Sequence, residues 1–271
     1  MKNYSTHSVD KKYSLDYQVY ITEDNKIISP FHSIDLFQHE NENIVTVVNE
    51  IPRFENGKFE IAKDTKCNPI KQDTKKNELR FVKNLFPFKG YMWNYGAMPQ
   101  TWEDKDAICE YTKCKGDNDP LDVLDISSIR KEIGQVYQGK VLGCLAMIDD
   151  GECDWKILVI DINDPLAKET NSSEDIEKHF KNYIESTVYW LKNYKVPDGK
   201  PVNEFGLDSK LMDQNFAMKI VHEAHNSWKR LISKKHVEGI RYELKDDKEV
   251  ESDKIVKDNL PEFVKEFYFI K

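Results

Sequence analysis

The 271-residue chain has few cysteines, no long apolar run at its start and no excess of positive charge. Its five cysteines include no C-x-x-C pair, so a zinc site is not indicated and free thiols in a reducing compartment are expected. The stretch from Met1 to Tyr20 has neither a signal-peptide pattern nor an anchor pattern. A formal charge of −8 disfavours binding to nucleic acid or to an anionic membrane. We therefore expect a cytoplasmic protein that binds neither.

Apolar side chains make up 39% of the sequence, enough for a substantial core. We expect a single domain over residues 1–271. The chain is weakly patterned up to about Asn43, and residues 1–30 are expected to form a divergent N-terminal extension that packs on the core or is partly disordered. Residues 233–271 form a divergent C-terminal segment, mixed in charge from Val237 to Lys257. Its aromatic run, residues 263–270, is expected to dock on the core or on a partner.

Two blocks of the sequence have the patterns of β-strands. Residues 44–48 are β-branched and residues 58–61 alternate, with the turn Glu55-Asn56-Gly57 between them, which predicts a hairpin. The apolar runs 141–148 and 157–160 flank an acidic turn and predict a second pair of strands. Together these blocks favour a small, highly twisted barrel.

Two later segments have helical periodicity. Ser172 and Asp175 match a capping box at the start of an apolar pattern that ends before Pro197. After Asp213, apolar residues recur at three- and four-residue spacing. The sequence therefore predicts a mainly β fold with peripheral helices, in which two main helices accompany the barrel.

The sharpest chemical signal is the run Gly116-Asp117-Asn118-Asp119-Pro120-Leu121-Asp122, with three carboxylates within six residues. Like charges this close repel unless cations neutralise them. Taken alone, the run could equally be an acidic surface turn. It is not an EF-hand, because Asp122 stands where that loop requires glycine.

A second acidic cluster, Asp149-Asp150-Gly151-Glu152-Cys153-Asp154-Trp155-Lys156, lies between the two apolar runs. An ordinary solvated hairpin tip would also explain its charges. However, Asp154 and Lys156 share a strand face with Leu158 and Ile160, which places the charged pair near the barrel mouth. Charges in such a place are unfavourable without ligands.

Further polar residues suited to a phosphate site are spread along the chain. They are Glu50, Lys58, Glu60, Arg80, Tyr91, Tyr95, Tyr194 and Lys195. Each has an ordinary explanation, such as a surface salt bridge between Lys58 and Glu60 or a core position for the tyrosines. Carboxylates combined with Lys, Arg and Tyr nevertheless suit chemistry on a multiply charged phosphate, since metal ions bridge its oxygens and cations neutralise the leaving group.

Several motifs, in order and spacing, resemble the family I soluble inorganic pyrophosphatases of the eukaryotic type. They are Glu50-Ile51-Pro52-Arg53, Lys58-x-Glu60, Asn94-Tyr95-Gly96 with Pro99-Gln100-Thr101-Trp102, the runs 116–122 and 149–156, and Tyr194-Lys195-x-Pro197-Asp198-Gly199-Lys200. The segment from Asp117 to Asp122 fits the family's D-x-D-P-x-D signature. The similarity covers about Phe31 to Ile232.

The resemblance implies a five-stranded, OB-like closed barrel with a site at its mouth and several Mg²⁺ ions. It implies that the two activating ions are bound by Asp117, Asp122 and Asp154. Asp149 and Glu60 are then ligands of metal that arrives with the substrate or bridges through water. The resemblance implies that Asp119 is the general base. It also implies that Lys58, Arg80 and Tyr95 are catalytic residues. Phosphate oxygens are expected on Lys58, Arg80, Tyr95, Lys156, Tyr194 and Lys195, with Glu50 and Tyr91 in supporting positions.

The implied reaction is Mg²⁺-dependent hydrolysis of pyrophosphate to two orthophosphates by a metal-activated water, without a covalent intermediate. A homodimer is also implied, with Phe54 and Phe267 standing where family members commonly have tryptophan at the interface. A non-catalytic cation binder would have no use for the cationic residues. An OB-type nucleic-acid binder is disfavoured by the acidic charge. A zinc protease is disfavoured because His222 and His225 are three residues apart rather than four.

Overall fold

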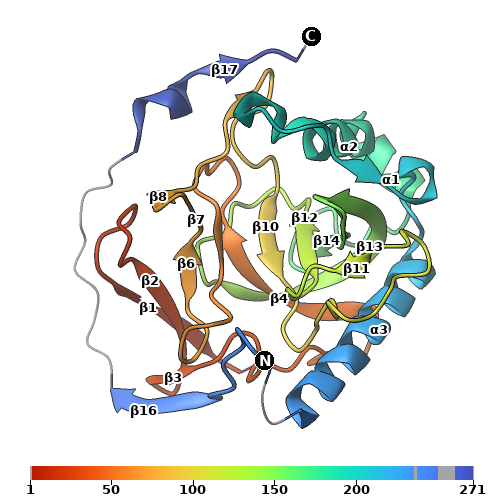
Figure 1. The fold of residues 1–271 in the computed structure, drawn as a ribbon. Helices are drawn as coiled ribbons and strands as arrows, with labels where there is room; N and C mark the ends of the chain where they lie inside the picture. Colours follow the sequence, from red (N-terminus) through yellow and green to blue (C-terminus); the bar gives the residue numbers. More distant parts are fainter. Residues whose placement is uncertain (1, 235–236, 250–259, 271) are drawn as a thin grey trace.

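The computed structural model describes residues 2–234, 237–249 and 260–270. In Figure 1 a ring of strands lies at the centre, the helices α1 to α3 lie along one side of it, and the sheet that contains β1, β2 and β3 lies on the other. Within the described ranges, no helix combines the length and the apolar character needed to cross a membrane.

Five strands close the central ring by hydrogen bonding in the order β14-β12-β10-β4-β13 and back to β14. They are β4 (Ile44–Ile51), β10 (Asn94–Ala97), β12 (Asp122–Asp125), β13 (Val136–Asp149) and β14 (Glu152–Asp161). The predicted mainly β fold with a closed five-stranded core is therefore confirmed. Every residue of β4 is buried, as expected for a strand covered on both faces.

The predicted strand pair around the acidic turn is confirmed as the hairpin of β13 and β14. Asp149 pairs with Glu152 across a two-residue turn in which Asp150 and Gly151 both have positive φ, 48° and 88°. Such a turn matches the twist of its strands. Two short strands extend this sheet, β11 (Lys115–Gly116) beside β14 and β15 (Glu204–Phe205) beside β13.

The predicted hairpin between residues 44–48 and 58–61 is wrong. β5 (Phe59–Ile61) pairs with β6 (Ile70–Gln72) in a second sheet, whereas β4 pairs with β10 and β13. The chain leaves β4 at Pro52, which has no backbone donor for a ladder. The link between the two strands comes instead from a side chain, since the Glu50 carboxylate accepts a hydrogen bond of 2.7 Å from the amide of Ile61.

The N-terminal segment is an integral part of this second sheet. Its strands β1 (Tyr4–Val9), β2 (Gln18–Glu23) and β3 (Lys26–Ile28) join β6, β5 and β16 (Lys245–Glu249). Val19 and Ile21 are 2% and 0% exposed and belong to the main core. Of the two expectations for this segment, packing on the core is the one observed.

The C-terminal aromatic run also packs on the core. β17 (Phe267–Tyr268) runs parallel to β9 (Asn84–Leu85), and Val264 is buried. A separate small pair is formed by β7 (Thr74–Lys75) and β8 (Glu78–Leu79). Residues 250–257 of the mixed-charge tail lie outside the described residues.

Three α-helices are found in the described chain where two main ones were predicted: α1 (Ser173–His179), α2 (Tyr183–Asn193) and α3 (Gln214–Ser233). Ser172 caps α1 through its side chain, as the sequence indicated, and Asp213, after which the second helix is predicted, caps α3 in the same way. The first predicted helix is split because Asn182 adopts a left-handed conformation with φ 60°. Short 3₁₀ turns are η1 (Val196–Asp198), η2 (Leu207–Ser209) and η3 (Glu262–Lys265).

Candidate active site

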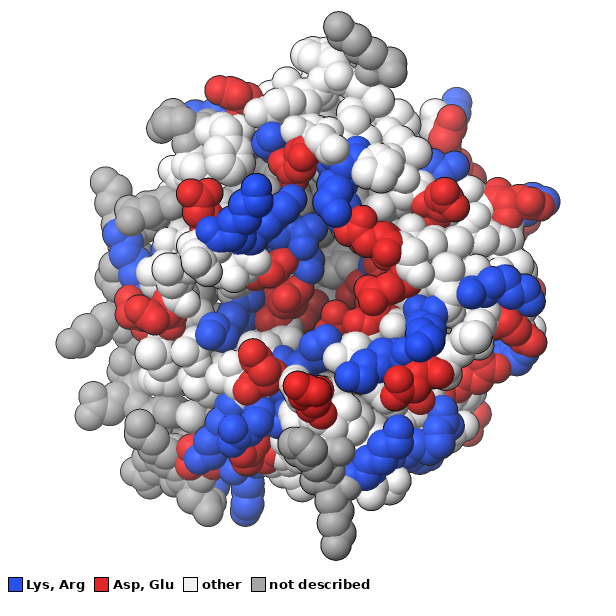
Figure 2. Space-filling model, viewed as in Figure 1, with Lys and Arg blue, Asp and Glu red and all other residues white. Residues whose placement is uncertain are grey.

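A cavity of about 200 Å³ opens at one end of the ring, where acidic and basic side chains surround a hollow (Figure 2). All fourteen side chains predicted for the site line it. They are Glu50, Lys58, Glu60, Arg80, Tyr91, Tyr95, Asp117, Asp119, Asp122, Asp149, Asp154, Lys156, Tyr194 and Lys195. The structure thus brings together residues far apart in the sequence, from Glu50 to Lys195. Their individual roles stay predictions.

Buried charges meet on the ring strands themselves. Lys156 follows Asp154 by two residues on β14 and lies opposite Asp122 on β12, so all three side chains share one face. The ammonium group contacts both carboxylates, and the Tyr95 hydroxyl also contacts Asp122. Burial raises the pKa of Asp154 to about 7. Burial alone would lower the pKa of Lys156, but the two carboxylates raise it well above its usual value.

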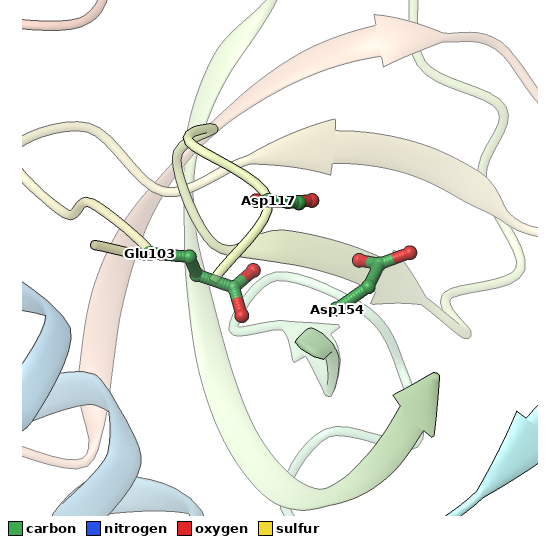
Figure 3. Close-up of side chains that lie close together, drawn as sticks. All are labelled: Glu103, Asp117 and Asp154. Atoms are coloured by element: carbon green, nitrogen blue, oxygen red, sulfur yellow. The ribbon is translucent and has the colours of Figure 1, made fainter. Parts of the chain in front are cut away.

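A residue that sequence reasoning missed, Glu103, completes an acidic group with Asp117 and Asp154 (Figure 3). One oxygen of each carboxylate lies within 4.8 Å of the others. Glu103 is 6% exposed; its Oε1 accepts a hydrogen bond of 3.1 Å from the amide of Trp155, and its Oε2 is buried without a protein partner. Burial first, and the neighbouring carboxylates second, raise the pKa of Glu103 well above its usual value.

Little in the sequence singles out Glu103. It directly follows the quoted Thr101-Trp102 pair, but Asp104 and Asp106 close by are equally acidic. What distinguishes Glu103 is backbone pairing with the aspartate loop. Its amide donates to the carbonyl of Asp119 at 2.8 Å, and its carbonyl accepts from the amide of Asn118 at 3.0 Å.

The loop from Asp117 to Asp122 is held in a sharp turn. Asn118 has φ 71°, a left-handed value that asparagine tolerates better than most residues. The Asp117 carboxylate accepts a hydrogen bond of 3.0 Å from the amide of Asp119. The Asp119 side chain is 43% exposed and pairs with the ammonium group of Lys63 at 2.5 Å. The Asp119 carboxylate is thus more exposed than that of Asp122, whose side chain is 19% exposed.

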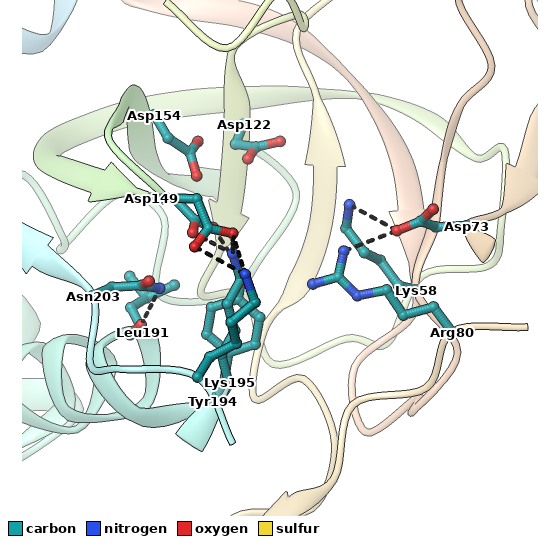
Figure 4. A network of polar contacts seen from close by, with 12 residues as sticks. Lys58, Asp73, Arg80, Asp122, Asp149, Asp154, Leu191, Tyr194, Lys195 and Asn203 are labelled. Atoms are coloured by element: carbon teal, nitrogen blue, oxygen red, sulfur yellow. Dashed lines mark hydrogen bonds and ion pairs between the residues drawn. The ribbon is translucent and has the colours of Figure 1, made fainter. Parts of the chain in front are cut away.

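One wall of the cavity carries cations that are held by a further missed residue, Asp73 (Figure 4). Its carboxylate lies 2.8 Å from Arg80 and 3.6 Å from Lys58. Burial acts to raise the pKa of Asp73, but the two cations lower it overall. Lys58 also pairs with Glu60 at 2.5 Å, so the predicted pair exists, although it lies at the cavity wall rather than on an ordinary surface.

The opposite wall comes from the end of α2. The Tyr194 hydroxyl donates to Asp149 at 3.0 Å, and Lys195 contacts the same carboxylate (Figure 4). Between the walls, the rings of Tyr91 and Tyr95 lie 5.3 Å apart, and burial raises the pKa of Tyr91 to about 12. The hydroxyls therefore stay protonated donors near neutral pH.

The acidic group fits a hard divalent cation. Its atoms are all carboxylate oxygens, the ligand type that Mg²⁺ prefers. The unpartnered Oε2 of Glu103 has no protein donor to offset its burial, and a bound cation would supply that interaction. His222 and His225, whose spacing disfavours a zinc site, make other contacts. The ring of His222 stacks on Phe37, and a ring nitrogen of His225 lies 2.6 Å from the carbonyl oxygen of Gln100.

Comparison with known proteins agrees with this geometry. The sequence model described as Inorganic pyrophosphatase matches residues 47–229. The chain is 54% identical to an inorganic pyrophosphatase of Encephalitozoon cuniculi over 279 aligned positions, which cover all of both chains.

Solved structures agree as well. The inorganic pyrophosphatase of Schistosoma japonicum has a TM-score of 0.93 at 38% identity, covering 98% of this chain and 100% of that one. An N-terminally truncated vacuolar soluble pyrophosphatase of Trypanosoma cruzi, solved in complex with PPi, has a TM-score of 0.80 at 35% identity, covering 86% and 92%. The chain therefore belongs to family I of the inorganic pyrophosphatases, in the eukaryotic group, and is a hydrolase.

Proposed function

We propose that the chain hydrolyses inorganic pyrophosphate to two orthophosphates and uses Mg²⁺ as its cofactor. The observation that carries this proposal is the meeting of a buried carboxylate group and a wall of cations in one cavity. A substrate with several negative charges needs both, since metal ions and cationic side chains share the neutralisation of its oxygens. The names of the related proteins support the same substrate.

The metal would be held by the predicted ligands Asp117, Asp122, Asp154, Asp149 and Glu60, to which we add Glu103. When bound there, Mg²⁺ would lower the pKa of a coordinated water and screen the phosphate charge. A carboxylate binds a cation in its ionised form, so bound metal would favour the ionised form of Asp154.

Asp119 would act as the general base. Its side chain is 43% exposed and lines the cavity, so it can reach an attacking water. Its partner Lys63 would have to turn aside as the proton is taken.

The substrate oxygens would be bound by Lys58, Arg80, Tyr95, Lys156, Tyr194 and Lys195, with Glu50 and Tyr91 supporting them. Asp73 holds Lys58 and Arg80 on one wall, and Asp149 holds Tyr194 and Lys195 on the other. Groups fixed in this way need little reorganisation when negative charge develops on the leaving phosphate. No side chain here needs to form a covalent intermediate.

A phosphate-release assay tests this proposal. Two phosphates should appear for each pyrophosphate with Mg²⁺, and none with a chelator in excess. Asp117→Ala should abolish release without loss of the far-UV circular dichroism spectrum, whereas Asp208→Asn, at a position 85% exposed, should retain it. Normal release by the Asp117 variant would refute the assignment of the site.

We also propose that the chain forms a homodimer through the surface around Phe54 and Phe267, whose side chains are 57% and 42% exposed. Cytoplasmic location is likewise an inference, from the composition of the chain. Binding of the cation without catalysis is the alternative that the same assay would support if no phosphate were released.

A further inference from the structure

The N-terminal segment contacts the carboxylate of Glu55, a buried residue that has no part in the proposed mechanism. Glu55 is 7% exposed and precedes Lys58 by three positions. One of its carboxylate oxygens, Oε2, lies 2.8 Å from the ammonium group of Lys12 and accepts a hydrogen bond of 2.7 Å from the hydroxyl of Tyr13. A buried carboxylate is unfavourable without such partners, and both of these come from the N-terminal segment.

The other oxygen of Glu55 fixes the turn that leads into Lys58. Oε1 accepts hydrogen bonds of 2.8 and 3.0 Å from the amides of Asn56 and Gly57. The amide of Lys58 then donates to the carbonyl of Arg80 at 3.0 Å. The carboxylate thus joins the N-terminal segment to backbone that carries both cations of this wall (Figure 4).

The ring of Tyr13 makes a second link to the same wall. It packs against the rings of Phe59 and Phe81, whose centroids lie 6.1 and 5.5 Å away. These phenylalanines directly follow Lys58 and Arg80 in the chain. Tyr13 is 7% exposed and has a left-handed backbone conformation with φ 65°, which is unfavourable for tyrosine and persists only where the surrounding contacts hold it.

Lys12 is held in place as well. Its side chain is 21% exposed, and its ammonium group lies 4.7 Å from the ring centroid of Tyr13 and 5.7 Å from that of Phe59. A cation within about 6 Å of an aromatic ring is attracted to its face. Solvent screens an ion pair with a buried carboxylate only weakly, so removal of the Lys12 charge should act directly on Glu55.

We propose that Lys12 and Tyr13 are positioning residues for the proposed pyrophosphate site. They act through Glu55 on the wall formed by Lys58 and Arg80. Their contacts hold the backbone of this wall, so that its ammonium and guanidinium groups meet the phosphate oxygens in a fixed geometry. This role rests on the proposed function, because it requires that the two cations of the wall bind the substrate.

Steady-state kinetics of the full chain with pyrophosphate and Mg²⁺ test this role. Lys12→Met should raise KM several-fold and lower kcat by less, because the displaced cations bind the ground state and the transition state alike. Lys12→Arg keeps the charge and should restore most of the loss. Lys2→Met is the matched control, since it removes an N-terminal lysine from an ion pair of 3.2 Å with Glu23 instead of Glu55, and it should leave KM unchanged.

Binding of a non-hydrolysable diphosphate analogue and of Mg²⁺ separates positioning from a merely structural effect. In Lys12→Met the affinity for the analogue should fall several-fold. The affinity of the free chain for Mg²⁺ should stay unchanged, because it depends on the acidic group and not on the cation wall. Tyr13→Phe keeps the ring and removes only the hydroxyl bond, so it should show a smaller change of the same kind. It decides the question if Lys12→Met lacks the far-UV circular dichroism spectrum of the folded chain.

The outcomes distinguish a failure of this role from a failure of the proposed function. A folded Lys12→Met variant with normal KM and normal analogue affinity would overturn the positioning role and leave the proposed function intact. A parallel loss of Mg²⁺ affinity and analogue affinity would also overturn it, because the segment would then only support the fold. If the unmodified chain neither releases phosphate nor binds the analogue, the proposed function fails, and the positioning role fails with it.

Discussion

The amide of Trp155 donates a hydrogen bond of 3.1 Å to Oε1 of Glu103, while Oε2 of the same carboxylate is buried with no protein partner. One oxygen thus fixes the side chain, and the carboxylate has an oxygen within 4.8 Å of carboxylate oxygens of Asp117 and Asp154. We therefore expect Glu103 to lower the stability of the metal-free protein and to strengthen the binding of Mg²⁺.

Glu103→Gln should therefore change stability and metal affinity in opposite directions. Removal of a buried, unpartnered carboxylate should raise the free energy of unfolding without metal by about 1–3 kcal/mol. Loss of the charge should weaken Mg²⁺ binding by roughly 10- to 100-fold. Denaturant unfolding and calorimetry measure the two effects, with Glu110→Gln, 65% exposed, as the control. A fall in both quantities would indicate a merely structural role.

Asp119→Asn should lower kcat by about 10²- to 10⁴-fold, because a general base contributes in this range. Its Mg²⁺ affinity should change little if Asp119 accepts the proton rather than binding the cation. Steady-state kinetics and metal titration separate these two roles. A variant with normal kcat and weakened Mg²⁺ binding would reassign Asp119 as a ligand.

Arg80→Lys should lower kcat/KM by about tenfold or more, although the charge is kept. Lysine has no planar fork and cannot contact both Asp73 and a phosphate oxygen as the guanidinium can. Steady-state kinetics on this variant and on Lys76→Arg, an exposed position in the same region, supply the comparison. Equal values for Arg80→Lys and the unmodified chain would show that only charge matters at this wall.

His32 should make the fold sensitive to acid. Its ring is 3% exposed, accepts a hydrogen bond of 3.0 Å from Trp228 at Nδ1 and contacts the carbonyl of Arg241 at Nε2. Burial lowers its pKa to about 4, so the neutral form stabilises the fold above the unfolded value of 6.5. That contribution is lost as pH falls from 6.5 to about 4, and it amounts to about 3 kcal/mol.

Denaturant unfolding at pH 7 and pH 4 checks this expectation. The unmodified chain should lose about 3 kcal/mol more than His32→Gln between these values, whereas His39→Gln, an exposed position, should behave like the unmodified chain. Identical losses for both histidine variants would contradict the assignment to His32.

The aromatic surface beside β17 should form a dimer contact. Phe86 lies 4.9 Å from Phe269 and 6.4 Å from Phe267 between ring centroids, and these side chains are 42–70% exposed. Phe267→Ala should shift the chain toward monomer at micromolar concentration, as measured by light scattering. If the unmodified chain is monomeric at the same concentration, the proposed dimer is wrong.

The features that could be predicted from the sequence are those with local patterns. β13 and β14 are adjacent in the chain and alternate clearly, so their hairpin and the placing of Asp149 and Asp154 at its end follow from the pattern. Asp117 and Asp122 stand out because three like charges lie close together in the sequence, and the resemblance gives them their expected role. The cap residues Ser172 and Asp213 likewise lie next to the helices that they begin.

The features that could not be predicted depend on distant contacts. Glu103 is identified as a site residue by its hydrogen bond from the amide of Trp155, 52 positions away. Asp73 is identified by its ion pairs with Lys58 and Arg80 of the cavity wall. The wrong hairpin has the same cause, because alternation shows that β4 and β5 are strands but not which strands they pair with. The break between α1 and α2 at Asn182 could not be predicted either, because the apolar periodicity of the sequence continues through this position.

Calorimetric titration of Mg²⁺ with and without a non-hydrolysable diphosphate analogue tests the central account most directly. We expect Mg²⁺ to bind the free chain, and more ions to bind when the analogue is present. The Asp154→Asn variant should lose the binding of Mg²⁺ to the free chain. An analogue that neither binds nor changes the Mg²⁺ isotherm would contradict a site built for both ligands.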